Sequence, residues 1–149
     1  MSLKLKLYQL CNSFIENRHN TIERSIDTIE TSLLSETKSS AGDKHETGRA
    51  MAQLEREKLG QQLVEINKIK QTLNRVKTIK TTNIVTIGSL VYTNQFNYYI
   101  AISAGEFIVN NNSFYAVSPN TPIGKLLIGK TIGDIILFKN KRINIIDVV

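Results

Sequence analysis

Hydrophobic residues in the first half of the chain recur at helical spacing. They form two series, Leu7, Leu10, Phe14, Ile22, Ile26, Ile29 and Leu33, and then Met51, Leu54, Leu59, Leu63, Ile66, Ile69, Leu73 and Val76. Steps of three and four with charged residues between them are typical of a narrow apolar seam, as in a coiled coil. We therefore expect two helices, each about 45–50 Å long. The small and polar residues 37–42 predict a short turn, so the helices form an antiparallel hairpin with its tip near residues 37–46.

The second half of the chain predicts short strands. Runs of β-branched and aromatic residues occur at 85–92, 98–102, 107–109, 114–117, 134–138 and 143–148, separated by Asn and Gly. Between the fourth and fifth runs, Thr121 suits a helix N-cap, Pro122 the first helical position and Gly129 the position after the end. Asn140–Lys141 suits a hairpin turn. We expect an antiparallel sheet with one short helix, so the whole chain belongs to the α+β class.

Composition changes near residue 80. Residues 1–80 hold 14 basic and 10 acidic side chains, whereas residues 81–149 hold 5 and 3. The change predicts two domains, a helical hairpin at 1–80 and a small α+β domain at 81–149.

Several classes of protein are excluded by composition. The single cysteine, Cys11, cannot form an internal disulfide and has no zinc-ligand spacing around it, and we expect it in the core. No apolar run approaches the ~18 residues of a membrane span, and Lys4 and Lys6 interrupt the first apolar stretch, so we expect a cytoplasmic protein. The net charge of +6 favours acidic partners or nucleic acid.

Asp43 and Glu46 are candidate functional residues at the predicted tip. In one interpretation Asp43 caps the second helix and Glu46 completes a capping box, which accounts for both residue types. In the other, residues three apart share a helix face and both carboxylates bind one cation. Mg²⁺ is usually held by one or two carboxylates together with waters and phosphate oxygens. The acids could therefore complete a magnesium site inside another macromolecule.

Other polar residues near the tip have both structural and functional interpretations. Lys44, Arg49 and Arg56 could steer phosphate groups, or could be ordinary solvated charges. His45 has the position of a solvated histidine, although a chemical role is open. Glu36 is either a third tip acid or the last-turn residue of the first helix.

Two stretches of the chain resemble a known family. Thr121-Pro-Ile-Gly-Lys-Leu-Leu-Ile-Gly-Lys-Thr-Ile-Gly-Asp134 is similar to the signature S-P-L-G-R-A-L-L-G-K-x-x-G-D, and Gly42-Asp-Lys-His-Glu46 is similar to G-D-x-x-E. Both motifs belong to the Gre transcript-cleavage factors of bacterial RNA polymerase. The expected order of a long hairpin and a small α+β domain also resembles that family over nearly the whole chain.

The resemblance implies a function for each part. The C-terminal domain would have an FKBP-like fold and dock on RNA polymerase, with the signature residues Pro122, Gly124, Lys125, Gly129, Lys130 and Asp134 at the docking surface. The hairpin would enter the polymerase's secondary channel, where Asp43 and Glu46 help bind the second catalytic Mg²⁺ and activate water. The protein would act as an accessory factor rather than an enzyme. Its partners would be RNA polymerase and the 3′ end of nascent RNA, with no membrane, and it would act as a monomer.

The chain departs from the family directly after the acids. Thr47, Gly48, Arg49 and Ala50 stand where the family commonly has N-A-E-Y. Because an acid and an aromatic residue are missing, a channel-binding inhibitor that does not stimulate cleavage is an alternative. Further alternatives are a hairpin that binds another partner, with the acids acting only as caps, and a peptidyl-prolyl isomerase on the FKBP-like domain.

Overall fold

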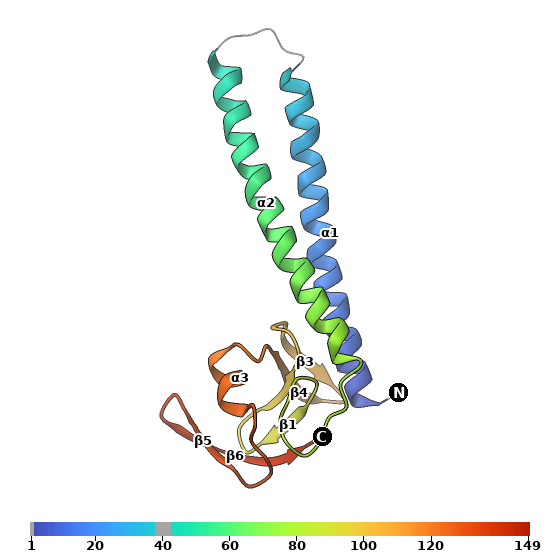
Figure 1. Cartoon of the computed structure of the whole chain (residues 1–149), viewed down its shortest axis with the longest axis vertical. Coiled ribbons are helices and arrows are strands. Elements are labelled where there is room, and N and C mark those ends of the chain that lie inside the picture. Colours follow the sequence, from blue (N-terminus) through green and yellow to red (C-terminus); the bar gives the residue numbers. More distant parts are fainter. Residues whose placement is uncertain (1, 38–42) are drawn as a thin grey trace. The chain divides into compact units, whose positions relative to one another are not determined.

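The computed structural model describes residues 2–37 and 43–149, apart from the side chains of residues 36–37 and 43–45. Two long helices come first, α1 (Leu3–Thr37) and α2 (Asp43–Val76), as the hydrophobic spacing predicts. They are the two long coiled ribbons labelled α1 and α2 in Figure 1. An ion pair joins them, because Arg56 Nε lies 3.0 Å from Glu30 Oε1. The predicted tip at 37–46 lies largely outside the described residues.

The buried positions of α1 differ in part from the predicted seam. Leu7, Cys11, Ile15, Ile22 and Ile26 are buried, whereas Leu10 is 37% exposed. The apparent break in the spacing is filled by His19, which is mostly buried and lies 3.5 Å from Glu23 through its Nε2 atom. The buried face of α1 therefore includes Cys11 and His19. Because neither residue is aliphatic, the spacing of aliphatic residues does not reveal these two positions.

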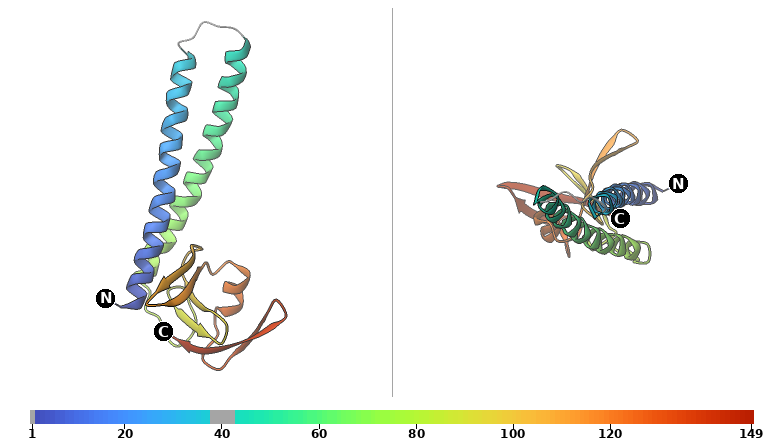
Figure 2. Two further views of the ribbon diagram at one scale, coloured as in Figure 1. Left: turned by 180° about the vertical axis from the view of Figure 1, so that it is seen from behind. Right: turned by 90° about the horizontal axis from the view of Figure 1, so that it is seen from above.

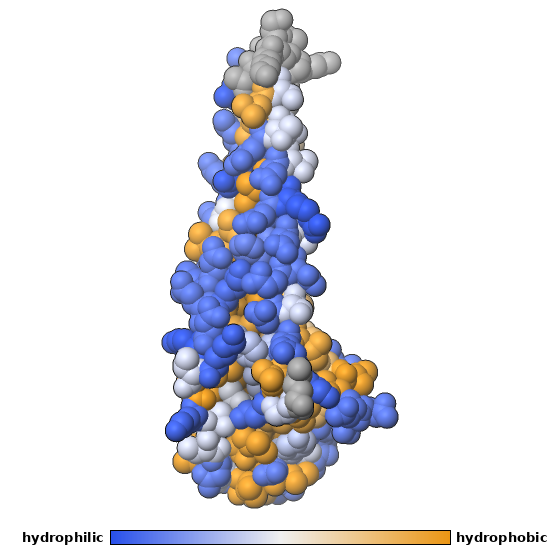
Figure 3. Space-filling view, turned by 90° about the vertical axis from the view of Figure 1, so that its right-hand side faces the viewer, coloured by the Kyte–Doolittle hydropathy of each residue, from blue (hydrophilic) through white to orange (hydrophobic). Residues whose placement is uncertain are grey.

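The seam of α2 is also shorter than its sequence suggests. Leu59, Ile66, Leu73 and Val76 are buried. Met51 and Leu54, however, are 67% and 63% exposed, and on α1 Leu34 is 65% exposed. Figure 3 shows one face of the molecule, on which hydrophilic residues cover most of the helical part and hydrophobic ones form separate spots.

A six-stranded sheet with one short helix follows the helices. The strands are β1 (Leu90–Thr93), β2 (Asn97–Ile100), β3 (Gly105–Val109), β4 (Asn112–Val117), β5 (Ile135–Phe138) and β6 (Lys141–Val148), in the spatial order β3-β4-β2-β1-β6-β5. The α+β class is confirmed. The sheet differs from the expected antiparallel one at a single pairing, because β2 pairs with β4 in parallel, with Tyr98 opposite Tyr115. Strand β3 forms one edge of the sheet, and β4 lies between β3 and β2.

Two tight turns use paired residues with positive φ. Asn110 (φ 52°) and Asn111 (φ 65°) join β3 to β4, and Lys139 (φ 51°) and Asn140 (φ 63°) join β5 to β6. Positive φ at both central residues is the geometry of a type I′ hairpin turn. The second turn therefore lies one residue earlier than the predicted Asn140–Lys141.

The first predicted strand is shorter in the structure than in the sequence pattern. β1 begins at Leu90, since residues 86–89 form a turn in which Ser89 N donates to Thr86 O at 3.0 Å. Val85 is nevertheless buried. Its N–H donates to Lys130 O at 2.8 Å, and its carbonyl accepts from Gly129 N at 2.9 Å.

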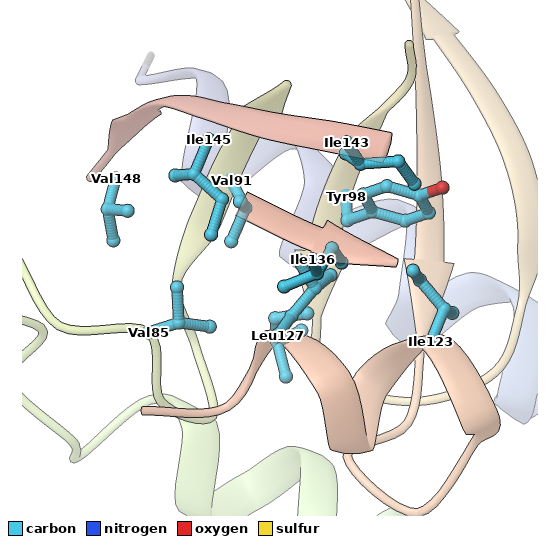
Figure 4. Packing of buried hydrophobic residues seen from close by; sticks show 10 residues of the cluster. Val85, Val91, Tyr98, Ile123, Leu127, Ile136, Ile143, Ile145 and Val148 are labelled. Atoms are coloured by element: carbon cyan, nitrogen blue, oxygen red, sulfur yellow. The ribbon is translucent and has the colours of Figure 1, made fainter. Parts of the chain in front are cut away.

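The core of this part lies between the sheet and helix α3 (Pro122–Leu127). Ile123 and Leu127 of α3 pack on residues from the strands, among them Ile136, Ile143 and Tyr98 (Figure 4). Side chains alternate along a strand, so Tyr99, between the two cluster members Tyr98 and Ile100, belongs to the opposite face of the sheet.

The chain divides into two compact units. One contains Met1–Phe14 and Ile69–Val149, and the other contains Ile15–Lys68. The sheet, α3, the first turns of α1 and the last turns of α2 thus form one unit, visible from two further directions in Figure 2. Whether 1–80 and 81–149 are separate domains stays a prediction. No helix within the described residues is long and apolar enough to span a membrane.

Candidate functional site

The acid pair lies at the start of the second helix. Helix α2 begins at Asp43, and Glu46 is exposed to solvent. Helical residues three apart lie on one face, so Asp43 and Glu46 share a face in the first turn. The capping interpretation puts Asp43 just outside the helix, whereas it is the first helical residue, a difference within the usual spread of helix ends. The side chains of Asp43, Lys44, His45 and Glu36 lie outside the described residues, so their contacts stay predictions.

The two predicted phosphate-steering arginines differ in their surroundings. Arg49 is exposed and lies three residues after Glu46, on the same helix face. Arg56 binds Glu30, and the two side chains are 37% and 52% exposed. Because the Arg56 guanidinium already has a carboxylate partner, Arg49 is the better placed of the two to meet an additional anion.

The donor set at the start of α2 fits magnesium only in part. Among the residues whose side chains are described, no group of three or more His, Cys, Asp or Glu could hold a metal. Two carboxylates with water and phosphate oxygens are a common magnesium environment. That Asp43 and Glu46 supply part of such a coordination shell, with further ligands from another molecule, stays a prediction.

The segment 121–134 contains the second candidate site. Thr121 caps α3 as predicted, since its Oγ1 accepts a hydrogen bond from Gly124 N at 3.1 Å, and Pro122 occupies the first turn. Gly129, with φ of 82°, follows the cap residue Ile128. Asp134 Oδ2 accepts from Thr131 N at 2.8 Å. Several residues of the predicted docking surface thus have roles in shaping their own backbone.

Gly124 has a packing role that the sequence does not reveal. It is buried, and a methyl group built on it would overlap the main-chain oxygen of Ser118 and lie 2.9 Å from Thr121 Oγ1. Lys125 and Pro122, in contrast, are exposed, and Lys130 is half-buried. Among the six predicted docking residues, the exposed Pro122 and Lys125 therefore remain the most accessible to a partner, together with the exposed backbone at Gly129.

A groove beside α3 brings in a residue that sequence reasoning missed. Its volume is about 420 Å³, and it is lined by Arg75, Lys125, Thr86, Ile87, Pro119 and Ile128. Arg75 lies in the last turn of α2. In the sequence, Arg75 is marked only as a basic residue near the end of a helical pattern. The fold brings it to the same groove as Lys125. Arg75 and Lys125 thus line the groove together with apolar residues, a combination that suits an acidic partner.

Comparison with models of known protein families finds no family that matches this chain, and no curated protein matches it.

Proposed function

We propose that this protein is a Gre-like regulator of bacterial RNA polymerase that acts in the cytoplasm. The observation that carries the proposal is the position of the acid pair, in the first turn of α2 where two long ion-paired helices are connected. The family-like segment 121–134 supports it independently, because Thr121, Gly124 and Gly129 have specific roles in the fold of that segment.

The proposed division of labour follows from exposure and charge. The groove at Arg75 and Lys125 contacts an acidic surface on the polymerase, while the start of α2 meets its active site through the secondary channel. Asp43 and Glu46 offer carboxylate oxygens there, and the polymerase and RNA supply the other ligands. A magnesium ion bound in that complex would supply Lewis-acid activation of water for cleavage of backtracked RNA. In this proposal the chain's own residues position charge, and the polymerase supplies the rest of the catalytic centre.

A double substitution tests the role of the acids. We expect Asp43→Ala with Glu46→Ala to reduce the cleavage of backtracked RNA at least ~100-fold, because both carboxylate ligands are lost. Purified protein is mixed with a stalled, backtracked elongation complex and Mg²⁺, and RNA shortening is followed on a gel. The matched control is Glu57→Ala with Glu65→Ala, which removes two exposed acids from the same helix.

Polymerase binding is measured on the same variants. The acid variant should bind like the wild-type chain, whereas Arg75→Ala with Lys125→Ala should bind at least ~10-fold more weakly. Normal cleavage by the acid variant would refute the role of the acids. Absence of any polymerase binding by the wild-type chain would refute the whole proposal, and would favour a hairpin that binds a different partner.

A non-cleaving channel inhibitor is the second candidate. It is favoured by Arg49, an exposed cation on the same helix face as Glu46, where the resembling family commonly has an acid. A neighbouring guanidinium competes with a metal ion for the carboxylate. Polymerase binding by the wild-type chain without RNA cleavage, combined with slower RNA extension, would favour this alternative.

A further inference from the structure

A cleft on the face of the sheet opposite α3 has features of a ligand site. Its volume is about 430 Å³, within the range of small-molecule pockets. The start of α1, the end of α2, the segment after it and strand β2 all contribute to its walls. Its polar lining consists of Lys4, Tyr8, Lys77, Thr81 and Tyr99. All belong to one compact unit, so the fold of that unit fixes their arrangement.

The charge of the cleft is positive. Lys4 and Lys77 line it, and no Asp or Glu side chain is among its lining residues. Lys4 Nζ donates to Thr81 Oγ1 at 2.7 Å and to the main-chain oxygen of Val149 at 3.0 Å. Burial lowers the pKa of Lys4, as expected for an ammonium group that has lost part of its hydration. Lys77 Nζ lies 5.0 Å from the centre of the Tyr8 ring, at the edge of the same cleft.

Tyr99 adds a buried polar group without a partner. Its side chain is 2% exposed, and no hydrogen bond joins its hydroxyl to any of the residues that the structure describes. Buried hydroxyl groups are rarely left unpaired, because the lost hydration is not replaced. An acceptor atom on a molecule in the cleft would satisfy this donor. The remaining walls are apolar and come mainly from Leu5, Val76 and Ile79.

We propose that this cleft binds a small organic anion, a phosphate or carboxylate group carried on a compact apolar body. The two lysines select the anion, Tyr99 donates a hydrogen bond, and the aliphatic and aromatic walls exclude water from the apolar part of the ligand. The site is separate from the acid pair and from the groove at Arg75, so it goes beyond the proposed function. A bound anion would also hold the first turns of α1 against the sheet and stabilise the unit by mass action.

Titration of the full chain tests this site with three probes, phenyl phosphate, benzoate and inorganic phosphate. Amide and Lys Nζ signals are followed by NMR, and affinities are measured by calorimetry. We expect saturable binding of phenyl phosphate or benzoate at ~1 mM or tighter, and at least ~10-fold weaker binding of inorganic phosphate. The tighter of the two aromatic probes identifies the anionic group as phosphate or carboxylate.

Matched variants locate the binding in the cleft. Lys77→Gln should lower the affinity for the tighter-binding probe at least ~10-fold. Lys80→Gln removes an exposed charge outside the cleft and should change this affinity less than ~2-fold. Tyr99→Phe should lower the affinity for this probe ~3-fold or more without unfolding the protein, since only the unpaired hydroxyl is removed. The proposal is overturned if no aromatic probe saturates below ~10 mM, if inorganic phosphate binds as tightly, or if Lys80→Gln weakens binding as much as Lys77→Gln.

Discussion

At the scale of single residues, the positive charge beside Glu46 bears on the function proposed for the start of α2. Arg49 is exposed on the same helix face. A cation at this position is compatible with binding inside a polymerase channel. It disfavours the binding of a metal ion nearby, because the two positive charges repel each other. The sequence alone identifies this residue, because helical spacing relates it to Glu46 without any knowledge of the tertiary fold.

Replacing Arg49 by an acid should therefore favour cleavage. We expect Arg49→Glu to raise the rate of RNA cleavage at least ~3-fold at limiting Mg²⁺, because a competing guanidinium is removed and a carboxylate is added. The measurement is the cleavage rate of a backtracked complex over a magnesium series. Lys58→Glu, the same charge reversal at an exposed position of α2, is the control. An unchanged magnesium dependence in Arg49→Glu would contradict the argument.

At the scale of elements, the turn before α3 is held by a very close backbone approach. Gly124 packs against Ser118 and Thr121 so closely that no larger residue fits without a movement of the main chain. This explains a glycine in the family-like segment by packing, without any docking role. The neighbouring exposed Lys125 has no such constraint, so the two residues can be separated experimentally.

Gly124→Ala should destabilise the sheet-containing unit by ~3 kcal/mol, because the added methyl overlaps a main-chain oxygen that cannot rotate away. Urea unfolding followed by circular dichroism measures the change. Lys125→Ala should alter the free energy of unfolding by less than ~0.5 kcal/mol. A Gly124→Ala variant of normal stability that fails to bind polymerase would instead show that this glycine acts at the docking surface.

Local elements could be predicted from the sequence more fully than their pairing. The two helices and the cap at Thr121 follow from spacing and residue type, because both are determined within a few residues. The parallel pairing of β2 with β4 could not be predicted, because the residue types at Tyr98 and Tyr115 do not indicate which strands pair. Likewise, the seam prediction favoured Leu10 over Ile15, because aliphatic spacing does not register His19 as an inward position.

At the scale of the whole molecule, the sites depend on contacts between distant parts of the sequence. The acid pair at 43 and 46 is proposed from the sequence because both residues lie in one helical turn, and its role stays a prediction. The groove at Arg75 and the cleft at Lys77 and Tyr99 could not be predicted, because each joins the end of α2 to strands or loops far along the chain. The first and last turns of the long helices thus belong to the sheet's unit.

Two buried acidic groups, the Cys11 thiol and the Tyr99 hydroxyl, predict that the protein becomes less stable at high pH. Burial raises the pKa of Cys11 to about 12 from its ordinary 9.0, and raises the pKa of Tyr99, to which nearby Cys11 and Tyr8 contribute. The folded state therefore retains protons that the unfolded chain releases. Their stabilising contribution is complete below pH 9 and falls between about pH 9 and 12.

Chemical denaturation at pH 7 and at pH 10 measures this loss. Cys11→Ala should lower the stability at pH 7 by ~1–2 kcal/mol, since a buried side chain is shortened, but should show a smaller further loss at pH 10. An equal or larger loss between the two pH values in the variant would contradict the assignment to Cys11.

The burial of Cys11 also allows the opening of the folded protein to be timed by chemical labelling of its thiol. The thiol is fully buried, and only a thiolate reacts with alkylating reagents, so the closed molecule resists labelling. Each labelling event then records a moment at which the packing around Cys11 has opened. The rate at high reagent concentration gives the opening rate, and the rate at low concentration gives the fraction of time spent open. Without an added dye or engineered residue, mass spectrometry could therefore time this motion in the free protein and in the protein bound to its partner.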